Sequence, residues 1–251
     1  MRLYSEFADW FHLLTAPEDY AEEAARYVEV MRARTRRPLR RVLELGAGGG
    51  NNALFMKREF TLTLTDVSPQ MLSQSRRINP ECEHVVGDMR SLRLEREFDA
   101  VFVHDAIMYA TREEELRATL ETAALHCAPG GVVVAVPDYV LETYAPFAAH
   151  GGHDDAHADR GLRYLEWVWM PEPESGVARV EFVLTLREGE DVRVEHESQR
   201  FGVFPRATWI RFFGELGLEV HEERGVSWTP GPNGPEPDCQ VVFAGVRPET
   251  P

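Results

Sequence analysis

Short apolar runs alternate with amphipathic segments along the first half of the chain. Runs at 42–45, 61–65, 84–86, 98–104 and 132–136 have the length and the share of β-branched residues that are typical of strands. Apolar residues recur at helical spacing in three places: after the glycine turn that ends the first run, after the Ser-Pro pair that follows the second run, and after the fourth run. Strands that alternate with helices at this distance predict a parallel sheet built from βαβ units.

Before the first strand, apolar residues recur at helical spacing over 3–14 and again over 20–31. Thr15 and Glu18 have the spacing of a capping box, and Pro17 suits the first turn of a helix. The sequence therefore predicts two helices, and the second would bury the stripe Tyr20, Ala24, Tyr27, Val28 and Met31.

The pattern changes after Asp138. Three long strand-like runs follow at 162–169, 177–186 and 192–201, with a turn at 188–191 between the last two. Consecutive strands joined by short turns predict an antiparallel element. The expected division is a core of residues 1–137 and 205–251, interrupted by an antiparallel insert over 138–204.

The end of the chain returns to the first pattern. Residues 206–216 are spaced as an amphipathic helix, and 218–221 and 240–246 are expected as closing strands. The proline- and glycine-rich stretch 229–237 is expected to be an irregular loop.

Composition excludes several classes of partner. The 251 residues carry a net charge of −15, with 27 basic against 42 acidic residues. Nucleic acid and anionic membrane surfaces need clustered positive charge, so neither is expected as a partner. Cys82, Cys127 and Cys239 are widely spaced, which supports neither a disulfide framework nor a thiolate zinc site. No apolar run reaches transmembrane length and no signal peptide is recognisable, so a cytoplasmic location is expected.

A glycine cluster follows the first strand. Gly46, Gly48 and Gly50 allow a sharp turn and a close approach of backbone to a ligand. The dinucleotide pattern requires a third glycine where this chain has Asn51, and no Lys-Ser/Thr pair follows to make a P-loop. The cluster by itself is equally compatible with a plain strand-to-helix turn.

Two acidic positions favour a nucleoside. Asp66 ends the second strand, where a carboxylate can accept hydrogen bonds from both hydroxyls of a ribose. Gly87, Asp88 and Met89 follow the third strand at the same edge, where an acid and an apolar neighbour can hold an adenine. Together these positions predict a nucleoside ligand that lacks a pyrophosphate.

Four motifs, in order, resemble those of class I S-adenosylmethionine-dependent methyltransferases. They are Glu44 to Gly50, Asp66 to Leu72, Gly87 to Met89, and Ala128 to Gly131. The resemblance implies a Rossmann-like α/β fold with seven strands, the last antiparallel and formed by 240–246, and an antiparallel β insert after the fifth strand. It also implies S-adenosyl-L-methionine as cofactor and S-adenosyl-L-homocysteine as product.

The same resemblance implies the cofactor-binding residues. Tyr4 and the stretch 19–24 look like those of methyltransferases that act on nucleotide-linked aminosugars, in which such tyrosines line the cofactor and acceptor pocket. The expected cofactor site comprises Tyr4, Tyr20, Glu44, Gly46, Ala47, Gly48, Asn51, Asp66, Val67, Met71, Gly87, Asp88, Met89 and His104.

The candidates for catalysis follow the fourth and fifth strands. His104, Asp105 and Tyr139 would lie at the carboxyl edge of the sheet, where open α/β folds bind ligands. His104 can orient an acceptor or take its proton, but His104 and Asp105 can equally pair with backbone groups beside the cofactor. A neutral amine needs only to lose a proton, whereas a hydroxyl needs a base or a metal.

The acceptor is expected near the insert. Tyr109 and Tyr144 can form part of a cage for a cation, or serve as core aromatics. The loop 150–161 supplies His153 and Asp154, and Glu166 follows it. That loop can bind the acceptor, bind a metal through aspartate oxygens, or be a plain solvated loop; no metal site is predicted, because no ligand spacing matches a defined motif.

The leading hypothesis is a methyltransferase that moves a methyl group to a nitrogen or oxygen of a small-molecule acceptor. One alternative is a cofactor-binding module of the same fold without turnover. A second is a nicotinamide oxidoreductase, which Asn51 disfavours. The exposed edges of the antiparallel insert are expected to allow a homodimer.

Overall fold

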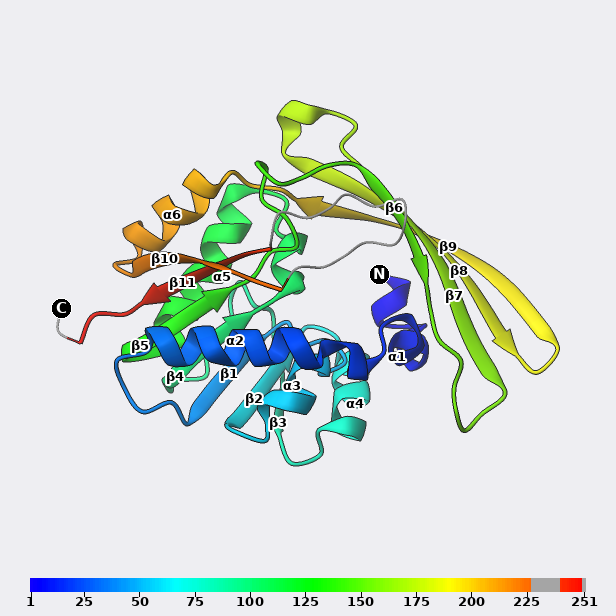
Figure 1. The fold of residues 1–251 in the computed structure, drawn as a ribbon, viewed down its shortest axis with the longest axis horizontal. Helices are drawn as coiled ribbons and strands as arrows, with labels where there is room; N and C mark the ends of the chain where they lie inside the picture. Colours follow the sequence, from blue (N-terminus) through cyan, green and yellow to red (C-terminus); the bar gives the residue numbers. More distant parts are fainter. Residues whose placement is uncertain (227–239, 250–251) are drawn as a thin grey trace.

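In the computed structural model, which describes residues 1–226 and 240–249, a seven-stranded sheet forms the core (Figure 1). Its strand order is β10-β11-β5-β4-β1-β2-β3. The strands are β1 (Arg41–Leu45), β2 (Thr61–Asp66), β3 (Glu83–Val86), β4 (Phe98–Val103), β5 (Cys127–Ala135), β10 (Glu219–Arg224) and β11 (Val241–Val246). β1 to β5 pair in parallel, and β11 runs antiparallel to both of its neighbours. The predicted sheet, with its antiparallel last strand, is therefore confirmed.

Helices cover both faces of this sheet. They are α2 (Ala21–Arg34), α3 (Asn51–Met56), α4 (Pro69–Ile78), α5 (Glu113–His126) and α6 (Arg206–Glu215). The apolar residues of α2 and α3 form one core cluster with one face, and those of α5 and α6 form another cluster with the opposite face. The Ser68 hydroxyl accepts the Met71 backbone N–H at 3.2 Å, which caps α4. A 3₁₀ turn, η4 (Asp105–Tyr109), follows β4 directly.

A second sheet of four antiparallel strands stands apart from the first (Figure 1). Its strands, in order, are β6 (Phe147–Gly151), β7 (Arg160–Trp169), β8 (Val177–Glu188) and β9 (Asp191–Gly202), and a 3₁₀ turn, η5 (Pro173–Ser175), lies between β7 and β8. The insert after the fifth strand is confirmed. β6 was not expected, because Phe147 is the only large apolar residue of that strand and no β-branched residue accompanies it.

The N-terminal segment is not the predicted continuous helix over 3–14. It consists of short turns: η1 (Arg2–Tyr4), η2 (Ala8–Trp10) and α1 (Phe11–Leu14), followed by η3 (Pro17–Tyr20). Its apolar residues Leu3, Phe7, Trp10 and Leu14 pack against the inner face of the second sheet, between that sheet and the core (Figure 1). A single straight helix buries one straight apolar stripe. Several short turns can follow the curved inner face of the second sheet and bury all four of these side chains.

The predicted capping box at Thr15 and Glu18 is also wrong. Ala16 precedes the first residue of η3, and no side-chain cap forms there. The Thr15 hydroxyl instead accepts a hydrogen bond from Asn51 Nδ2 at 3.0 Å, which ties the N-terminal segment to the glycine turn. The proline-glycine stretch 229–237 and Cys239 lie outside the described residues.

Among the described residues, no helix is both long enough and apolar enough to cross a membrane. Within those same ranges, no three His, Cys, Asp or Glu side chains converge as metal ligands.

Candidate active site

A cavity of about 1190 Å³ lies between the carboxyl edge of the main sheet, the N-terminal turns and the inner face of the second sheet. It opens beside β1 and β4, where the strand order of the sheet changes direction. Open α/β sheets bind their ligands at this point, because the two neighbouring connections leave in opposite directions. The fold therefore offers one large site, walled on one side by the insert.

The glycine turn after β1 has the backbone conformation that only glycine adopts at low cost. Gly46, Gly48 and Gly50 have φ angles of +70°, +53° and +78°. A Cβ on Gly46 would lie 2.4 Å from the Cβ of Ala106, so the absence of a side chain lets the turn pack against η4. The turn thus presents bare backbone to the cavity.

Asp66 holds this turn and faces the cavity. Its two carboxylate oxygens accept backbone N–H groups from Gly48 at 2.9 Å and Ser68 at 2.8 Å. Burial raises the pKa of Asp66, and those hydrogen bonds oppose the rise. Each carboxylate oxygen keeps a second lone pair for a ligand hydroxyl. Val67 beside it is 69% exposed although it lines the cavity, which leaves apolar surface for a base.

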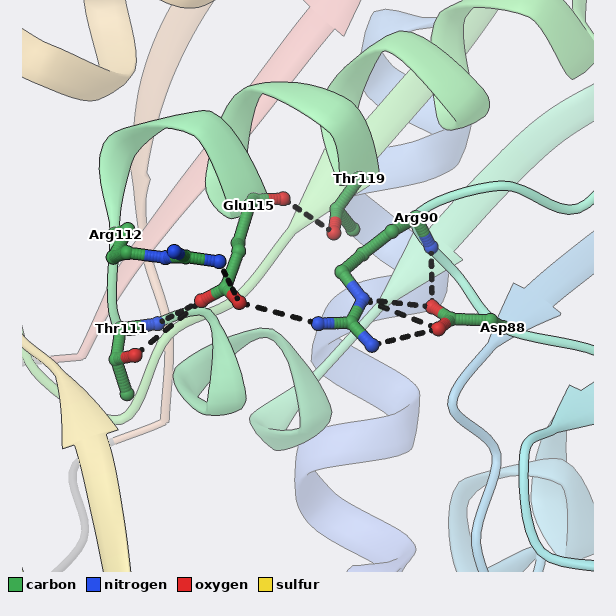
Figure 2. A network of polar contacts seen from close by, with 6 residues as sticks. All are labelled: Asp88, Arg90, Thr111, Arg112, Glu115 and Thr119. Carbon is green, nitrogen blue, oxygen red and sulfur yellow. Dashed lines mark hydrogen bonds and ion pairs between the residues drawn. The ribbon is translucent and has the colours of Figure 1, made fainter.

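Asp88 is bound by Arg90, which no sequence motif indicated (Figure 2). Arg90 donates to Asp88 from its backbone N–H at 2.9 Å and from Nε and Nη2 at 3.0 and 2.7 Å. Its Nη1 reaches Glu115 of α5 at 3.3 Å, and Glu115 also accepts the Thr111 backbone N–H. These contacts fix the far end of the cavity to α5, and the Arg90 guanidinium holds the pKa of Asp88 below its usual range.

Three oxygens at the cavity wall have no hydrogen-bond partner within the described residues: Glu23 Oε1, which lies 3.9 Å from His104 Nε2, Glu44 Oε2 and Asn52 Oδ1. Glu44 and Asn52 are only 5% and 4% exposed, and burial raises the pKa of Glu44 to about 8. A buried acceptor without a donor is costly unless a ligand supplies one. An ammonium group has three donors and a positive charge, so this wall fits the amino group of a methionine moiety.

His104 is the central polar group of the site. Its Nε2 lies 2.9 Å from the Tyr27 hydroxyl and 2.9 Å from Asp105 Oδ1, and Tyr27 in turn donates to Gln240 Oε1 at 2.8 Å. Burial by itself lowers the pKa of His104, but the negative charges of Asp105 and Glu23 outweigh it and raise the pKa to about 9. At neutral pH the ring is an imidazolium clamped between these groups, which makes it a poor proton acceptor.

Carboxyl groups gather next to His104. Burial and the neighbouring charge of Asp105 raise the pKa of Asp138 well above its usual range, so protonated Asp138 donates a hydrogen bond to Asp105. Glu166, from strand β7 of the insert, faces the same pair, and burial followed by the charge of Asp105 raises its pKa to about 7. Tyr139 lies beside Asp138, and burial raises its pKa. Asp105, Asp138 and Glu166 are referred to below as the carboxyl cluster.

Tyrosines join the N-terminal turns to the rest of the site. The hydroxyls of Tyr4 and Tyr109 lie 2.6 Å apart, and Tyr109 donates to Gln199 Oε1 of β9 at 2.7 Å. Glu197 of the same strand accepts the Leu3 backbone N–H at 2.9 Å. The N-terminus, η4 and the insert are therefore locked together over the cavity.

The structure brings nearly all of the predicted site residues to this cavity. Two do not line it: Tyr144 packs edge-on against Tyr139, and Asp154 is exposed and pairs with Arg163 at 2.7 Å. His153 lines the opening with 41% of its side chain exposed. The lining residues among the candidates are Tyr4, Tyr20, Glu44, Gly46, Ala47, Gly48, Asn51, Asp66, Val67, Met71, Gly87, Asp88, Met89, His104, Asp105, Tyr109, Tyr139, His153 and Glu166.

Several polar residues of the site were missed. Glu23 and Tyr27 are four residues apart on α2, and Asn52 stands on α3. Tyr20, a predicted site residue, lies at helical spacing from Glu23 and Tyr27, and Asn51, another predicted site residue, directly precedes Asn52. A helical wheel that starts from Tyr20 and Asn51 therefore points to all three. Gln240 carries no sequence signal of this kind.

Comparison with known proteins points to one activity. Residues 42–131 match a family model described as a methyltransferase domain. The chain is 30% identical, over 97% of both chains, to dTDP-3-amino-3,4,6-trideoxy-alpha-D-glucopyranose N,N-dimethyltransferase of Streptomyces venezuelae. It is 31% identical to dTDP-3-amino-3,6-dideoxy-alpha-D-glucopyranose N,N-dimethyltransferase of Streptomyces fradiae, over 86% of this chain and 82% of that one. The crystal structure of Streptomyces venezuelae DesVI superimposes with a TM-score of 0.82 at 27% identity, covering 96% of this chain and 98% of the other.

These similarities extend over the insert as well as the core, and they give no support to a nicotinamide oxidoreductase or to a module without turnover. The protein is an enzyme, its cofactor is S-adenosyl-L-methionine, and it moves a methyl group to a small-molecule acceptor. The chain belongs to the class I S-adenosylmethionine-dependent methyltransferases of the small-molecule type.

Proposed function

We propose that this enzyme methylates the nitrogen of an amine, and that the amine belongs to an aminosugar. The observation that carries the proposal is the carboxyl cluster, which stands beside His104 at the cavity floor and includes Glu166 from the insert. Carboxyl groups suit an amine, whose methylated product is a cation before it releases its proton. The two curated relatives are named as aminosugar N,N-dimethyltransferases, which supports the same choice.

When bound, the cofactor supplies the methyl group: the nitrogen lone pair forms the new N–C bond, and the sulfonium sulfur keeps the electron pair of the broken S–C bond. The enzyme has to hold the two reactants in line and remove one proton. Orientation of this kind accounts for about 7–11 kcal/mol in favourable cases.

Glu166 is our candidate for the proton acceptor. A carboxyl with a pKa of about 7 is ionised in part at neutral pH, which is the condition for efficient proton transfer. Asp105 and His104 would act by position, since His104 is already protonated and Asp105 is bound to it. Tyr139 would close the same wall.

For the cofactor, we assign the ribose hydroxyls to Asp66 and the methionine amino group to Glu44. Gly46, Ala47 and Gly48 would face the methionine moiety, while Val67, Met71 and Met89 would enclose the adenine. Asp88, both of whose oxygens contact Arg90, would meet the adenine edge with a lone pair that Arg90 leaves free. Tyr4, Tyr20 and Asn51 would close the site from the N-terminal side.

For the acceptor, we assign Tyr109 and His153 to the wall that faces it, and residues 138–204 to an acceptor lid over a core of residues 1–137 and 205–251. Tyr144 would act only by supporting Tyr139. Asp154 would take no part, because Arg163 holds it at the surface.

We also propose a homodimer and a cytoplasmic location. The outer face of the insert exposes Leu165, Trp167, Val192 and Val194, each by 49% or more, which is apolar area suited to a second copy. Light scattering at several concentrations tests the dimer, and cell fractionation tests the location.

The test of the function is a matched pair of acceptors with the purified enzyme and cofactor. One is the methyl glycoside of a 3-amino-3,6-dideoxy sugar, and the other has a hydroxyl in place of the amine. We expect methylation of the amine only, detected by mass spectrometry. Equal turnover of the alcohol would contradict nitrogen as the acceptor atom.

A further inference from the structure

The cavity has a strongly negative lining. Its described residues include nine aspartates and glutamates, while Arg90 is the only arginine or lysine among them. Burial raises the pKa of Glu23, Glu44, Asp66, Asp138 and Glu166, which lowers their share of the negative charge. Glu44, Asp66 and Asp88 are assigned to the cofactor, which leaves Asp19, Glu22, Glu23, Asp105, Asp138 and Glu166 to face the acceptor, against the cations Arg90 and His104.

Arg90 has no charge to spare for a ligand. Its guanidinium contacts both oxygens of Asp88 and one oxygen of Glu115, so two carboxylates compensate its single charge (Figure 2). Glu115 lies on α5, and the arrangement is anchored there by the Thr111 backbone N–H and by Arg112. A phosphate at this end of the cavity would have to displace an ion pair.

The sequence adds no cation from the stretch that the structure does not describe. Residues 227–239 join Val226 to Gln240, both of which line the cavity, and they contain no lysine, arginine or histidine. Two of them, Glu236 and Asp238, are acidic.

We propose that the acceptor is an amine that carries no phosphate, bound in a cavity selective for cations. The inference rests on nitrogen methylation as proposed above and names the class of acceptor. It separates this enzyme from the two relatives, whose names specify dTDP-linked sugars. A diphosphate brings about two negative charges, and recognition of such groups relies on arginine or lysine donors or on a field of positive sign.

The same lining suits a cationic amine. Asp105, Asp138 and Glu166 line one end of the cavity, and Glu23 Oε1 and Asn52 Oδ1 have no hydrogen-bond partner within the described residues. An aminosugar with several hydroxyls and an ammonium group would satisfy these acceptors without adding negative charge. A glycoside or a free aminosugar fits this description.

Calorimetry with the enzyme loaded with S-adenosylhomocysteine tests the proposal, with dTDP and thymidine as probes. We expect dTDP to bind no more tightly than thymidine, including the case in which neither binds detectably. Binding of dTDP at least threefold tighter than thymidine would overturn the proposal. Failure of S-adenosylhomocysteine itself to bind would instead contradict the cofactor site, so the two failures are distinguishable.

A charge variant tests the electrostatic reason. Glu22 lies at the cavity wall, and Glu22→Arg should raise the affinity for dTDP several-fold at low salt, where such effects are largest. Glu121→Arg makes the same charge change on the exposed side of α5 and serves as the control. An equal response of the two variants would overturn the cavity charge as the cause.

Matched substrates complete the test: the methyl glycoside of the aminosugar should have a kcat/KM at least tenfold that of its dTDP-linked form, and the reverse order would refute the proposal.

Discussion

Replacement of Glu166 by glutamine should stabilise the protein at pH values above about 7. Glu166 lies partly buried on β7, and its pKa is raised from 4.5 to about 7, first by burial and then by the charge of Asp105. That difference corresponds to about 3 kcal/mol between the two protonation states. Water in the cavity screens the charge, so we expect about 1–2 kcal/mol in practice.

The direction of the pH dependence of stability follows from where Glu166 binds its proton more tightly. The folded state holds the Glu166 proton more tightly than the unfolded state does. The contribution of Glu166 to the free energy of unfolding is therefore greatest below pH 4.5 and is lost as the pH rises through about 7. Glutamine resembles the protonated form at every pH and lacks this loss. Glu44 titrates in both proteins, and its effect cancels in the difference. Asp138 responds to the charge of Glu166, so the measured difference includes the change at Asp138 as well.

The assay is urea unfolding of the wild type and of Glu166→Gln at pH 5 and pH 8. The free-energy difference between the two proteins should grow by about 1–2 kcal/mol in favour of the variant at the higher pH. Glu174→Gln, an exposed carboxyl in the β7–β8 connection, is the control and should show no such growth. An equal difference at both pH values would refute the raised pKa of Glu166. The variant should also lose the rise of methylation rate with pH near 7.

Three further variants probe the rest of the site. Asp66→Ala would remove the two proposed charge-assisted hydrogen bonds to the ribose, worth about 1.5 kcal/mol each, and should weaken S-adenosylhomocysteine binding about 100-fold by calorimetry; a change below threefold would show that the ribose lies elsewhere. Gly46→Ala should abolish that binding, because its Cβ would lie 2.4 Å from Ala106, whereas Gly189→Ala, with a similar φ of +63° and open space around it, should cost only about 1 kcal/mol of stability and leave binding intact. Tyr109→Phe leaves a buried glutamine of β9 without its donor and should cost about 1–3 kcal/mol in urea unfolding, with faster hydrogen exchange over residues 2–14; unchanged exchange there would contradict its role in locking the N-terminal segment.

The carboxyl edge of the sheet was predictable because strand ends fix neighbouring residues in space. An apolar run predicts the strand, and the residues at or just after its end must lie at the edge of the sheet. This placed Asp66, Asp88 and His104 from the sequence alone. The positions of these residues depend only on local pattern and on the parallel pairing of strands.

What the sequence left out depends on distant surfaces. Residues 3–14 have a helical pattern, but the second sheet against which they pack lies more than a hundred residues away in the chain. Glu23 faces the cavity, yet a polar helix position that faces a cavity looks the same in sequence as one that faces water. His153 and Asp154 are neighbours in one loop, but only His153 lines the cavity. Asp154 pairs with Arg163 at the surface instead, and the sequence does not show that pairing.

The most direct test of the account is a crystal structure with S-adenosylhomocysteine bound. We predict the ribose hydroxyls on Asp66, the amino group at Glu44, and the sulfur directed toward Asp105, Asp138 and Glu166, from where a methyl group would reach an acceptor under the insert. A sulfur directed away from this carboxyl cluster, with the ribose still on Asp66, would contradict the proposed site of methyl transfer.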